Sequence, residues 1–160
     1  MSRNYWLFKS EPDAFSLDDL RVMGHEHWDG VRNYQACNML RDDIHEGDGV
    51  LFYHSRIKEP AVVGIAQVAR SGYPDFTAWN PESKYFDPRA SAEKPVWYMV
   101  DVAFVAQLPT PVTLNQIKGH PALTDMMVAR KGSRLSVQPV RPEEWRAVLA
   151  LGGIGVDPLG

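Results

Sequence analysis

Apolar residues occupy both faces of the stretch from Gly47 to Ser55, which opens with a Gly-Asp-Gly turn. Successive side chains of an extended strand point to opposite faces, so an apolar start on both faces predicts burial on both sides. Polar character then increases toward the end, where Tyr53, His54 and Ser55 follow one another. We predict a central strand that runs from the core into a cavity. A core strand whose end meets solvent is the alternative.

Further apolar and β-branched runs predict more strands along the chain. The predicted strands cover residues 5–9, 49–55, 61–69, 95–105 and 135–140. Gly64 indicates a bulge or bend within its strand, and Pro109 and Pro111 are expected to close the strand before them. Residues 73–89 form a long irregular segment rich in aromatic side chains, which is typical of a functional loop. A flap that covers one end of the core is the alternative.

Short helices are predicted between and around these strands. Ser16 and Asn33 are suitable N-cap residues, because their side-chain oxygens can accept an N–H of the first helical turn. Pro142 marks a further helix start, since proline fits the first helical position. The predicted helices cover residues 17–21, 34–44, 113–118, 121–123 and 142–149.

The pattern predicts a single domain over residues 1–150 and a flexible, glycine-rich tail over residues 151–160. The regular alternation of strands and helices that typifies a doubly wound parallel sheet is absent. Strands interrupted by glycine, with helices at the periphery, indicate instead an α+β fold with a small, bent, barrel-like sheet of about five or six strands. A hydrophobic fraction of 44% in 160 residues is sufficient to fill one core.

Composition excludes several classes of protein. No apolar run reaches the roughly 18 residues of a membrane span, and the N-terminal residues lack the apolar region of a secretory signal. Cys37 is the only cysteine, so neither an internal disulfide nor a cysteine-built metal site is expected, and a cytoplasmic location is predicted. The net charge of −3 argues against coating nucleic acid through bulk electrostatics, but it leaves room for a local basic face.

Motifs of common catalytic chemistry are missing. The chain has no phosphate-binding loop, dinucleotide fingerprint, zinc-protease helix motif or nucleophile elbow. Its five histidines show no ligand spacing supported by acids, so no metal or other cofactor is expected. His54 and Ser55 are neighbours on a strand and face opposite ways, which prevents a catalytic pair. We therefore predict that the protein is not an enzyme.

Aromatic side chains are interleaved with polar ones. Five tryptophans and six tyrosines exceed what a core of this size requires. Rings can stack on base faces, amides and hydroxyls can bind a base edge, and lysine or arginine can bind phosphate. Residues 130–134 contain the one tight basic cluster of the sequence. The chain is thus predicted to bind nucleic acid through a nucleobase; a small-molecule or protein-interaction module is the alternative.

Four motifs resemble the EVE domain family: YWLFKSEP at residues 5–12, WDGVRNYQA at 28–36, GDGVLFYHS at 47–55 and GSRLSVQP at 132–139. The resemblance extends over nearly the whole chain and implies a PUA-like fold, a bent β-barrel surrounded by short helices. It also implies recognition of a modified nucleobase in a pocket, with DNA or RNA carrying that base as the partner. An enzyme that acts on modified nucleotides is the alternative. Cys37 departs from the family pattern, in which arginine often follows Gln-Ala, and this weakens the expected contact with a long nucleic-acid backbone.

The candidate site residues fall into three chemical groups. Candidate stacking rings are Trp6, Trp28, Tyr34 and Trp79, of which two are expected to be core residues. Candidate contacts to the edge of the base are Lys9, Ser10, Asn33, His54, Ser55, Ser136 and Gln138, with Tyr53 as a further pocket residue. Candidate phosphate contacts are Arg32, Arg130, Lys131 and Arg134.

Several candidates have a purely structural alternative. Arg32 could instead pair with Asp29, Asp48 or Glu11. Ser136 and Gln138 could simply satisfy neighbouring backbone groups. A monomer is expected, or a weak homodimer formed through an exposed strand edge at residues 97–98.

Overall fold

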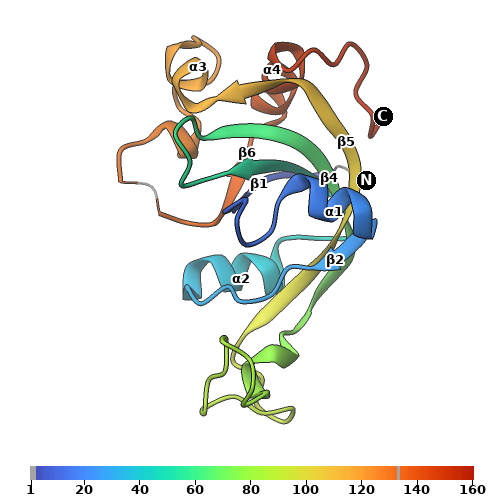
Figure 1. The fold of residues 1–160 in the computed structure, drawn as a ribbon, viewed down its shortest axis with the longest axis vertical. Helices are drawn as coiled ribbons and strands as arrows, with labels where there is room; N and C mark the ends of the chain where they lie inside the picture. The colour runs from blue at the N-terminus through green and yellow to red at the C-terminus, as the bar shows by residue number, and fades with distance from the viewer. Residues whose placement is uncertain (1–2, 133) are drawn as a thin grey trace.

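A single mixed sheet forms the centre of the computed structural model, which describes residues 3–132 and 134–160 (Figure 1). The strand order is β2-β5-β4-β3-β1-β6, with β1 and β3 parallel and all other neighbours antiparallel. The strands are β1 (Tyr5–Ser10), β2 (His25–His27), β3 (Gly49–His54), β4 (Ala61–Pro74), β5 (Tyr98–Thr113) and β6 (Val137–Val140). The prediction of an α+β fold with five or six strands is confirmed.

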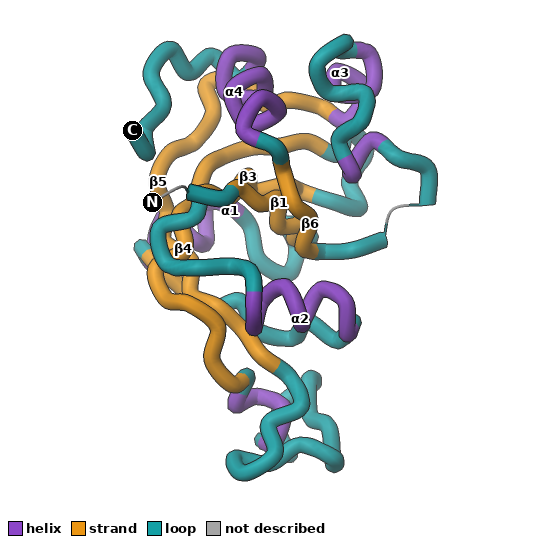
Figure 2. The backbone as a smooth tube through the Cα atoms, turned by 180° about the vertical axis from the view of Figure 1, so that it is seen from behind, coloured by secondary structure: helices purple, strands orange, loops and turns teal. Residues whose placement is uncertain are grey.

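Both faces of the sheet are buried, as the pattern of the central strand predicts. On β3, Val50 and Phe52 pack into one core, whereas Leu51 and Tyr53 pack into the other. The helices that cover the two cores are α1 (Leu17–Met23) and α2 (Tyr34–Asp42) for the first, and α3 (Leu114–Gly119) and α4 (Pro142–Leu151) for the second. Figures 1 and 2 show α3 and α4 at one end of the molecule and α2 on the opposite side of the sheet.

Three helices begin at the residues that the sequence indicates. The side chains of Ser16 and Asn33 each accept, at 3.0 Å, the N–H three positions further on. Pro142 occupies the first turn of α4. These local hydrogen bonds satisfy donors that a helix leaves unpaired at its start, which is why the sequence alone locates them.

The predicted helical turn at residues 121–123 is wrong. These residues form an irregular turn, in which the His120 ring accepts the Ala122 N–H at 3.1 Å. A short 3-10 helix, η2 (Met127–Ala129), follows instead.

Strand β5 is longer than the sequence indicates. The expectation that Pro109 and Pro111 end it is wrong, because pairing with β4 resumes at Val112. Between the pairs Gly64–Gln107 and Val62–Val112, residues 108–111 of β5 lie opposite Val63 alone. The prolines lie within this bulge, where a missing N–H breaks no ladder hydrogen bond.

Strand β2 has no counterpart among the predicted strands. It is a polar segment of three residues, His25–His27, and pairs with residues 101–103 of β5. The Trp28 N–H extends the pairing by donating to the Val100 carbonyl at 2.7 Å. Backbone hydrogen bonds rather than apolar side chains hold β2 at the sheet edge, so no hydrophobic pattern reveals it.

Beyond the body of the sheet, β4 and β5 continue as a two-stranded arm (Figures 1 and 2). The arm carries η1 (Phe76–Trp79) and the irregular segment up to residue 97. It packs on α2 through a small third core that includes Cys37, Ala78 and Trp97. This contact fixes the aromatic-rich loop beside the segment that follows β2.

The segment after α4 contacts the second core. The Trp145 indole N–H donates to the Asp157 carboxylate at 2.9 Å, and Leu159 packs against the same core. Leu151 still belongs to α4, so the helix extends into the predicted tail, while the flexibility of the remainder stays a prediction. Within the described residues, none of the helices combines the length and apolar character that crossing a membrane requires.

Candidate functional site

One cavity lies where the end of β1, the segment after β2 and the arm come together. Its volume is about 450 Å³, within the range of about 300–1,000 Å³ typical of small-ligand sites. The described lining includes the rings of Phe15, Trp28 and Tyr85, the cations Lys9, Arg32 and Lys84, the carboxylates Glu11, Glu26 and Asp29, and the hydroxyls of Ser10 and Ser136. The cavity therefore combines flat apolar faces with both signs of charge.

Trp28 supplies a buried aromatic surface to the cavity. Its ring lies 5.2 Å from that of Phe8 and 5.6 Å from that of Phe52, measured between centroids, and only 9% of the residue is exposed. Phe15 packs against the same ring edge-on at 6.1 Å. Packing from β1 and β3 thus fixes this ring in place, which lowers the entropy that a stacked ligand would have to remove.

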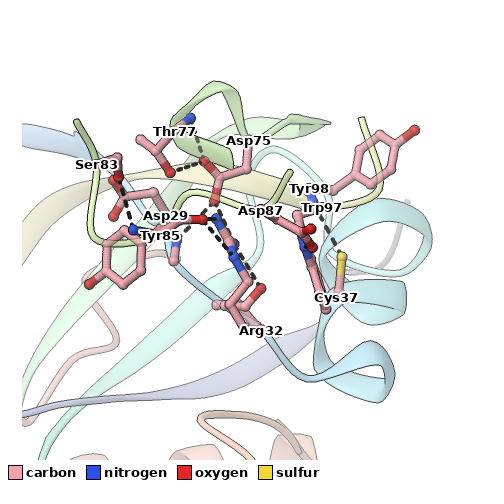
Figure 3. Close-up of polar contacts among 12 residues, drawn as sticks. Asp29, Arg32, Cys37, Asp75, Thr77, Ser83, Tyr85, Asp87, Trp97 and Tyr98 are labelled. Atoms are coloured by element: carbon pink, nitrogen blue, oxygen red, sulfur yellow. Dashed lines mark hydrogen bonds and ion pairs between the residues drawn. The ribbon is translucent and has the colours of Figure 1, made fainter. Parts of the chain in front are cut away.

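Arg32 ties the segment after β2 to the arm (Figure 3). It donates from Nη1 to the Asp75 carboxylate at 3.0 Å, and from Nε and Nη2 to the Tyr85 carbonyl at 3.3 and 2.8 Å. Asp75 is fully buried and also accepts the N–H groups of Gly30 and Thr77, each at 2.9 Å. One buried carboxylate therefore connects both walls of the cavity.

None of the partners considered for Arg32 in the sequence is the one it binds. Glu11 pairs with Arg56 at 2.9 Å, and Asp48 accepts three N–H donors from other residues. The actual partner, Asp75, is 43 positions away in the sequence. Arg32 thus pairs with a carboxylate, as the structural alternative states, but that carboxylate is Asp75.

Tyr85 closes the cavity over the turn at Gly30. Gly30 has φ +77°, and a Cβ at this position would come within 2.4 Å of the Tyr85 ring. The guanidinium of Arg32 lies 5.5 Å from the centroid of the same ring, and the ammonium of Lys84 lies 5.1 Å from it. The ring is held by contacts that require glycine at position 30.

Carboxylates line the side of the cavity formed by β2 and the segment after it. Glu26 Oε1 lies 3.0 Å from His27 Nδ1, and Asp29 Oδ2 lies 3.8 Å from His27 Nε2. Burial, followed by the nearby charge of Asp75, raises the pKa of Asp29 above its usual range. A half-buried carboxylate of this kind gains most when a ligand N–H donates to it.

Five of the predicted site residues line this cavity, namely Lys9, Ser10, Trp28, Arg32 and Ser136. Burial lowers the pKa of Lys9, and its backbone N–H donates to the Ser136 carbonyl at 2.8 Å. The Ser10 hydroxyl donates to the carbonyl of Phe15. The fold thus brings together residues from motifs more than a hundred positions apart.

Three predicted site residues lie in the cores instead. The Trp6 indole N–H donates to Asp48 at 3.0 Å, and Tyr53 is 3% exposed within the second core. Gln138 is 1% exposed and donates from Nε2 to the Leu135 carbonyl at 2.9 Å. For Trp6 and Gln138 these are the structural alternatives that the sequence left open.

Five more predicted residues lie outside the described cavity lining. Asn33 is the N-cap of α2, and the His54 ring accepts the first N–H of α1 at 3.1 Å. The Ser55 N–H donates to the Ser10 carbonyl at 3.0 Å, and Trp79 packs on the third core. Tyr34 is exposed and stacks on another ring outside the cavity. Their side chains or backbone groups support the folded chain around the cavity.

The predicted phosphate contacts Arg130, Lys131 and Arg134 do not belong to the described cavity lining. All three are exposed, and Arg130 donates to the Asp125 carbonyl at 3.1 Å. Ser133, within the same basic cluster, lies outside the described residues. A phosphate role for this cluster stays a prediction.

Sequence reasoning missed seven polar or aromatic residues of the lining, namely Glu11, Phe15, Glu26, His27, Asp29, Lys84 and Tyr85. Asp29 had a usable signal, because it sits inside the Trp-Asp-Gly motif. Lys84 and Tyr85 had a weaker one, since they lie in the aromatic-rich loop whose function was inferred only from its length. Among the residues that the structure describes, no group of three or more His, Cys, Asp or Glu side chains is placed to hold a metal ion.

Comparisons with known proteins identify the family of the chain. The model of the EVE domain family matches residues 4–151. A Pseudomonas syringae protein of known crystal structure is 47% identical, with a TM-score of 0.88 over 92% of this chain and 99% of that one. The human THYN1 protein, solved in complex with 5-methylcytosine-containing DNA, is 35% identical, with a TM-score of 0.87 over 96% of this chain and 99% of that one. Rat thymocyte nuclear protein 1 is 38% identical over 92% of this chain and 73% of its own length. The PUA-like α+β fold is thereby confirmed, and the chain belongs to the EVE domain family.

Proposed function

We propose that this protein is a non-catalytic reader of a modified nucleobase in nucleic acid, and that the base enters the cavity beside Trp28. The observation that carries the proposal is the pairing of a fixed aromatic face with half-buried carboxylates in a volume of about 450 Å³. A base offers a flat ring for the first and N–H donors for the second. The human relative solved with 5-methylcytosine-containing DNA supports the same class of ligand.

The chemistry of the lining favours a cytosine-type base. Asp29 and Glu26 are acceptors, and the exocyclic amine of cytosine is a donor, whereas the corresponding groups of thymine and uracil are carbonyl acceptors. A thymine carbonyl placed against these carboxylates would leave both sides without a donor. A methyl group on the base adds apolar surface, worth about 0.8 kcal/mol if fully buried.

Calorimetric titration with 5-methyl-2′-deoxycytidine, 2′-deoxycytidine and thymidine tests this proposal. The methylated cytidine should bind most tightly, and thymidine should bind at least tenfold more weakly. In Asp29→Asn the affinity for the cytidines should fall roughly ten- to hundredfold, because a hydrogen bond to a charged group contributes about 1.5–3 kcal/mol. Asp18→Asn, a change to an exposed carboxylate on α1, is the matched control and should bind normally.

Two results would refute the proposal. One is equal affinity for all three nucleosides, which would favour an interaction module without base selectivity. The other is unchanged affinity in Asp29→Asn, which would place the ligand elsewhere.

Incubation of the same nucleosides with the protein, followed by chromatography, tests the alternative of an enzyme, which would convert one of them. Titration with matched DNA and RNA oligonucleotides tests which of the two is the natural partner. We further propose that the protein acts in the cytoplasm as a monomer or weak homodimer.

A further inference from the structure

A row of rings and one guanidinium leads away from the cavity, and Figure 3 labels three of its members, Tyr85, Arg32 and Trp97. The Arg32 guanidinium lies between two rings, 5.5 Å from the centroid of Tyr85 and 5.2 Å from that of Trp97. On α2, the ring of Tyr34 stacks on Trp97 at 4.8 Å, with 20° between the planes. The row therefore connects a wall of the cavity to a ring on the surface.

A second, smaller cleft borders the first three members of this row, Tyr85, Arg32 and Trp97. Its volume is about 280 Å³, and it shares Arg32, Lys84 and Tyr85 with the cavity. Phe86 and Trp97 complete its aromatic lining. Because three residues border both spaces, the cleft adjoins the cavity at Tyr85.

The ring at the end of the row is fixed although it is exposed. Tyr34 is 56% exposed, yet its hydroxyl accepts from Arg89 Nη1 at 3.0 Å. Arg89 in turn donates to Asp87 at 2.8 Å, and Asp87 accepts the Trp97 indole N–H at 2.8 Å. These charged and aromatic donors hold the pKa of Asp87 well below its usual range. An exposed tyrosine is ordinarily free to change rotamer, so this network sets its orientation in advance.

We propose that this surface binds the nucleotide adjacent to the recognised base on the same strand, with the neighbouring base stacked on the open face of Tyr34. This inference rests on the proposed function, since it extends the same ligand out of the cavity. Aromatic side chains bind successive bases of single-stranded nucleic acid in a way that tolerates any sequence. Lys84, which lies along the row, carries the positive charge that the intervening phosphate requires.

The test compares a nucleoside with a strand. The probes are 5-methyl-2′-deoxycytidine and a five-nucleotide DNA strand with 5-methylcytosine at its centre. Tyr34→Leu removes the ring, and Tyr34→Phe keeps the ring but loses the bond from Arg89. We expect the wild-type protein to bind the strand at least tenfold more tightly than the nucleoside. Tyr34→Leu should lose about tenfold in affinity for the strand and none for the nucleoside, while Tyr34→Phe should retain most of the affinity for both.

Each other outcome has a distinct meaning. Equal strand affinity in Tyr34→Leu and wild type would overturn the inference while leaving the proposed function intact. An equal loss for both probes would also overturn it, because Tyr34 would then act only by supporting the arm and the cavity. Wild-type protein that binds the DNA strand no more tightly than the nucleoside would also overturn the inference. If neither probe bound to the wild-type protein, the proposed function itself would fail.

Discussion

Replacing Asp75 by asparagine perturbs one side chain that holds both walls of the cavity. Oδ1 accepts the N–H and the hydroxyl of Thr77, and Oδ2 accepts the Gly30 N–H and the Arg32 guanidinium. An amide keeps one oxygen acceptor and replaces the other by a donor. With its NH₂ toward Gly30 and Arg32 the amide faces two donors. With its NH₂ toward Thr77 it leaves only the Thr77 N–H unpaired, because the Thr77 hydroxyl can turn and accept, and Arg32 then keeps a neutral acceptor in place of a charged one.

The magnitude follows from the donor left unpaired and from the loss of the charge opposite Arg32. Each buried donor left unsatisfied costs about 1–3 kcal/mol. The Arg32 side chain is 23% exposed and can turn partly toward water, which places its share near the low end of that range. We expect Asp75→Asn to lower the free energy of unfolding by about 3 kcal/mol. For a domain of this size that corresponds to a fall in Tm of about 6–12 °C.

Urea unfolding followed by tryptophan fluorescence measures this loss. Asp18→Asn should stay within about 0.5 kcal/mol of the wild type, because its carboxylate is exposed and its ion pair with Arg21 is long, at 3.5 Å. Arg32→Met combined with Asp75→Asn should cost at least 1 kcal/mol less than the two single changes added together, since both remove the same contact. An Asp75→Asn variant as stable as Asp18→Asn would show that the carboxylate does not hold the walls together.

Three further changes test other parts of the site. Gly30→Ala should destabilise the fold by about 2–4 kcal/mol in thermal melts, since it adds the cost of a positive φ to a collision with Tyr85; a loss below 1 kcal/mol would contradict that packing. Burial and the charge of Asp75 raise the pKa of Asp29, so its charged carboxylate opposes folding at neutral pH. Asp29→Asn should therefore raise Tm at pH 7.5, and this gain should vanish as the pH falls toward 3.8. A gain in Tm that does not depend on pH would argue against a charge effect. Burial lowers the pKa of His54 below 6.5, so the folded chain resists protonation and its stability falls as the pH drops below 6.5. His54→Gln should reduce the slope of stability against pH in this range. An unchanged slope would mean that other groups cause the loss of stability.

Local patterns were sufficient for most of the scaffold. The double-sided burial of β3 follows from apolar residues at successive positions, and the start of α2 follows from the Asn33 side chain. Both depend on residues within a few positions of each other, where chain connectivity fixes the geometry. The resemblance to the EVE domain located three motifs that reach the cavity for the same reason, because each motif is a continuous run. Residues 47–55, the fourth motif, contribute none of the described lining, so the expectation that the central strand ends in this cavity is wrong.

The contacts that shape the cavity are not local. Arg32 binds Asp75 and the Tyr85 carbonyl, 43 and 53 positions away, and many carboxylates and carbonyls would serve equally well on chemical grounds. Choosing among them requires knowing that the arm folds back over α2. The same limit explains Trp6 and Gln138: their polar groups are typical of a binding site, but the fold supplies partners for them inside the core.

Charge provides a way to separate recognition by shape from attraction to phosphate. Along the cavity and the adjoining cleft, Arg32 is paired with Asp75 and Arg89 with Asp87, while Lys84 has no ion pair within residues 3–132 and 134–160. With the one phosphate that Lys84 neutralises, the logarithm of the affinity for a single strand should fall against the logarithm of the salt concentration with a slope of about −0.7. Between 50 and 200 mM salt this is a loss of roughly threefold. A slope of about −3 or steeper would mean that the exposed residues Arg130, Lys131 and Arg134 also bind the strand, although the net charge of the chain is −3.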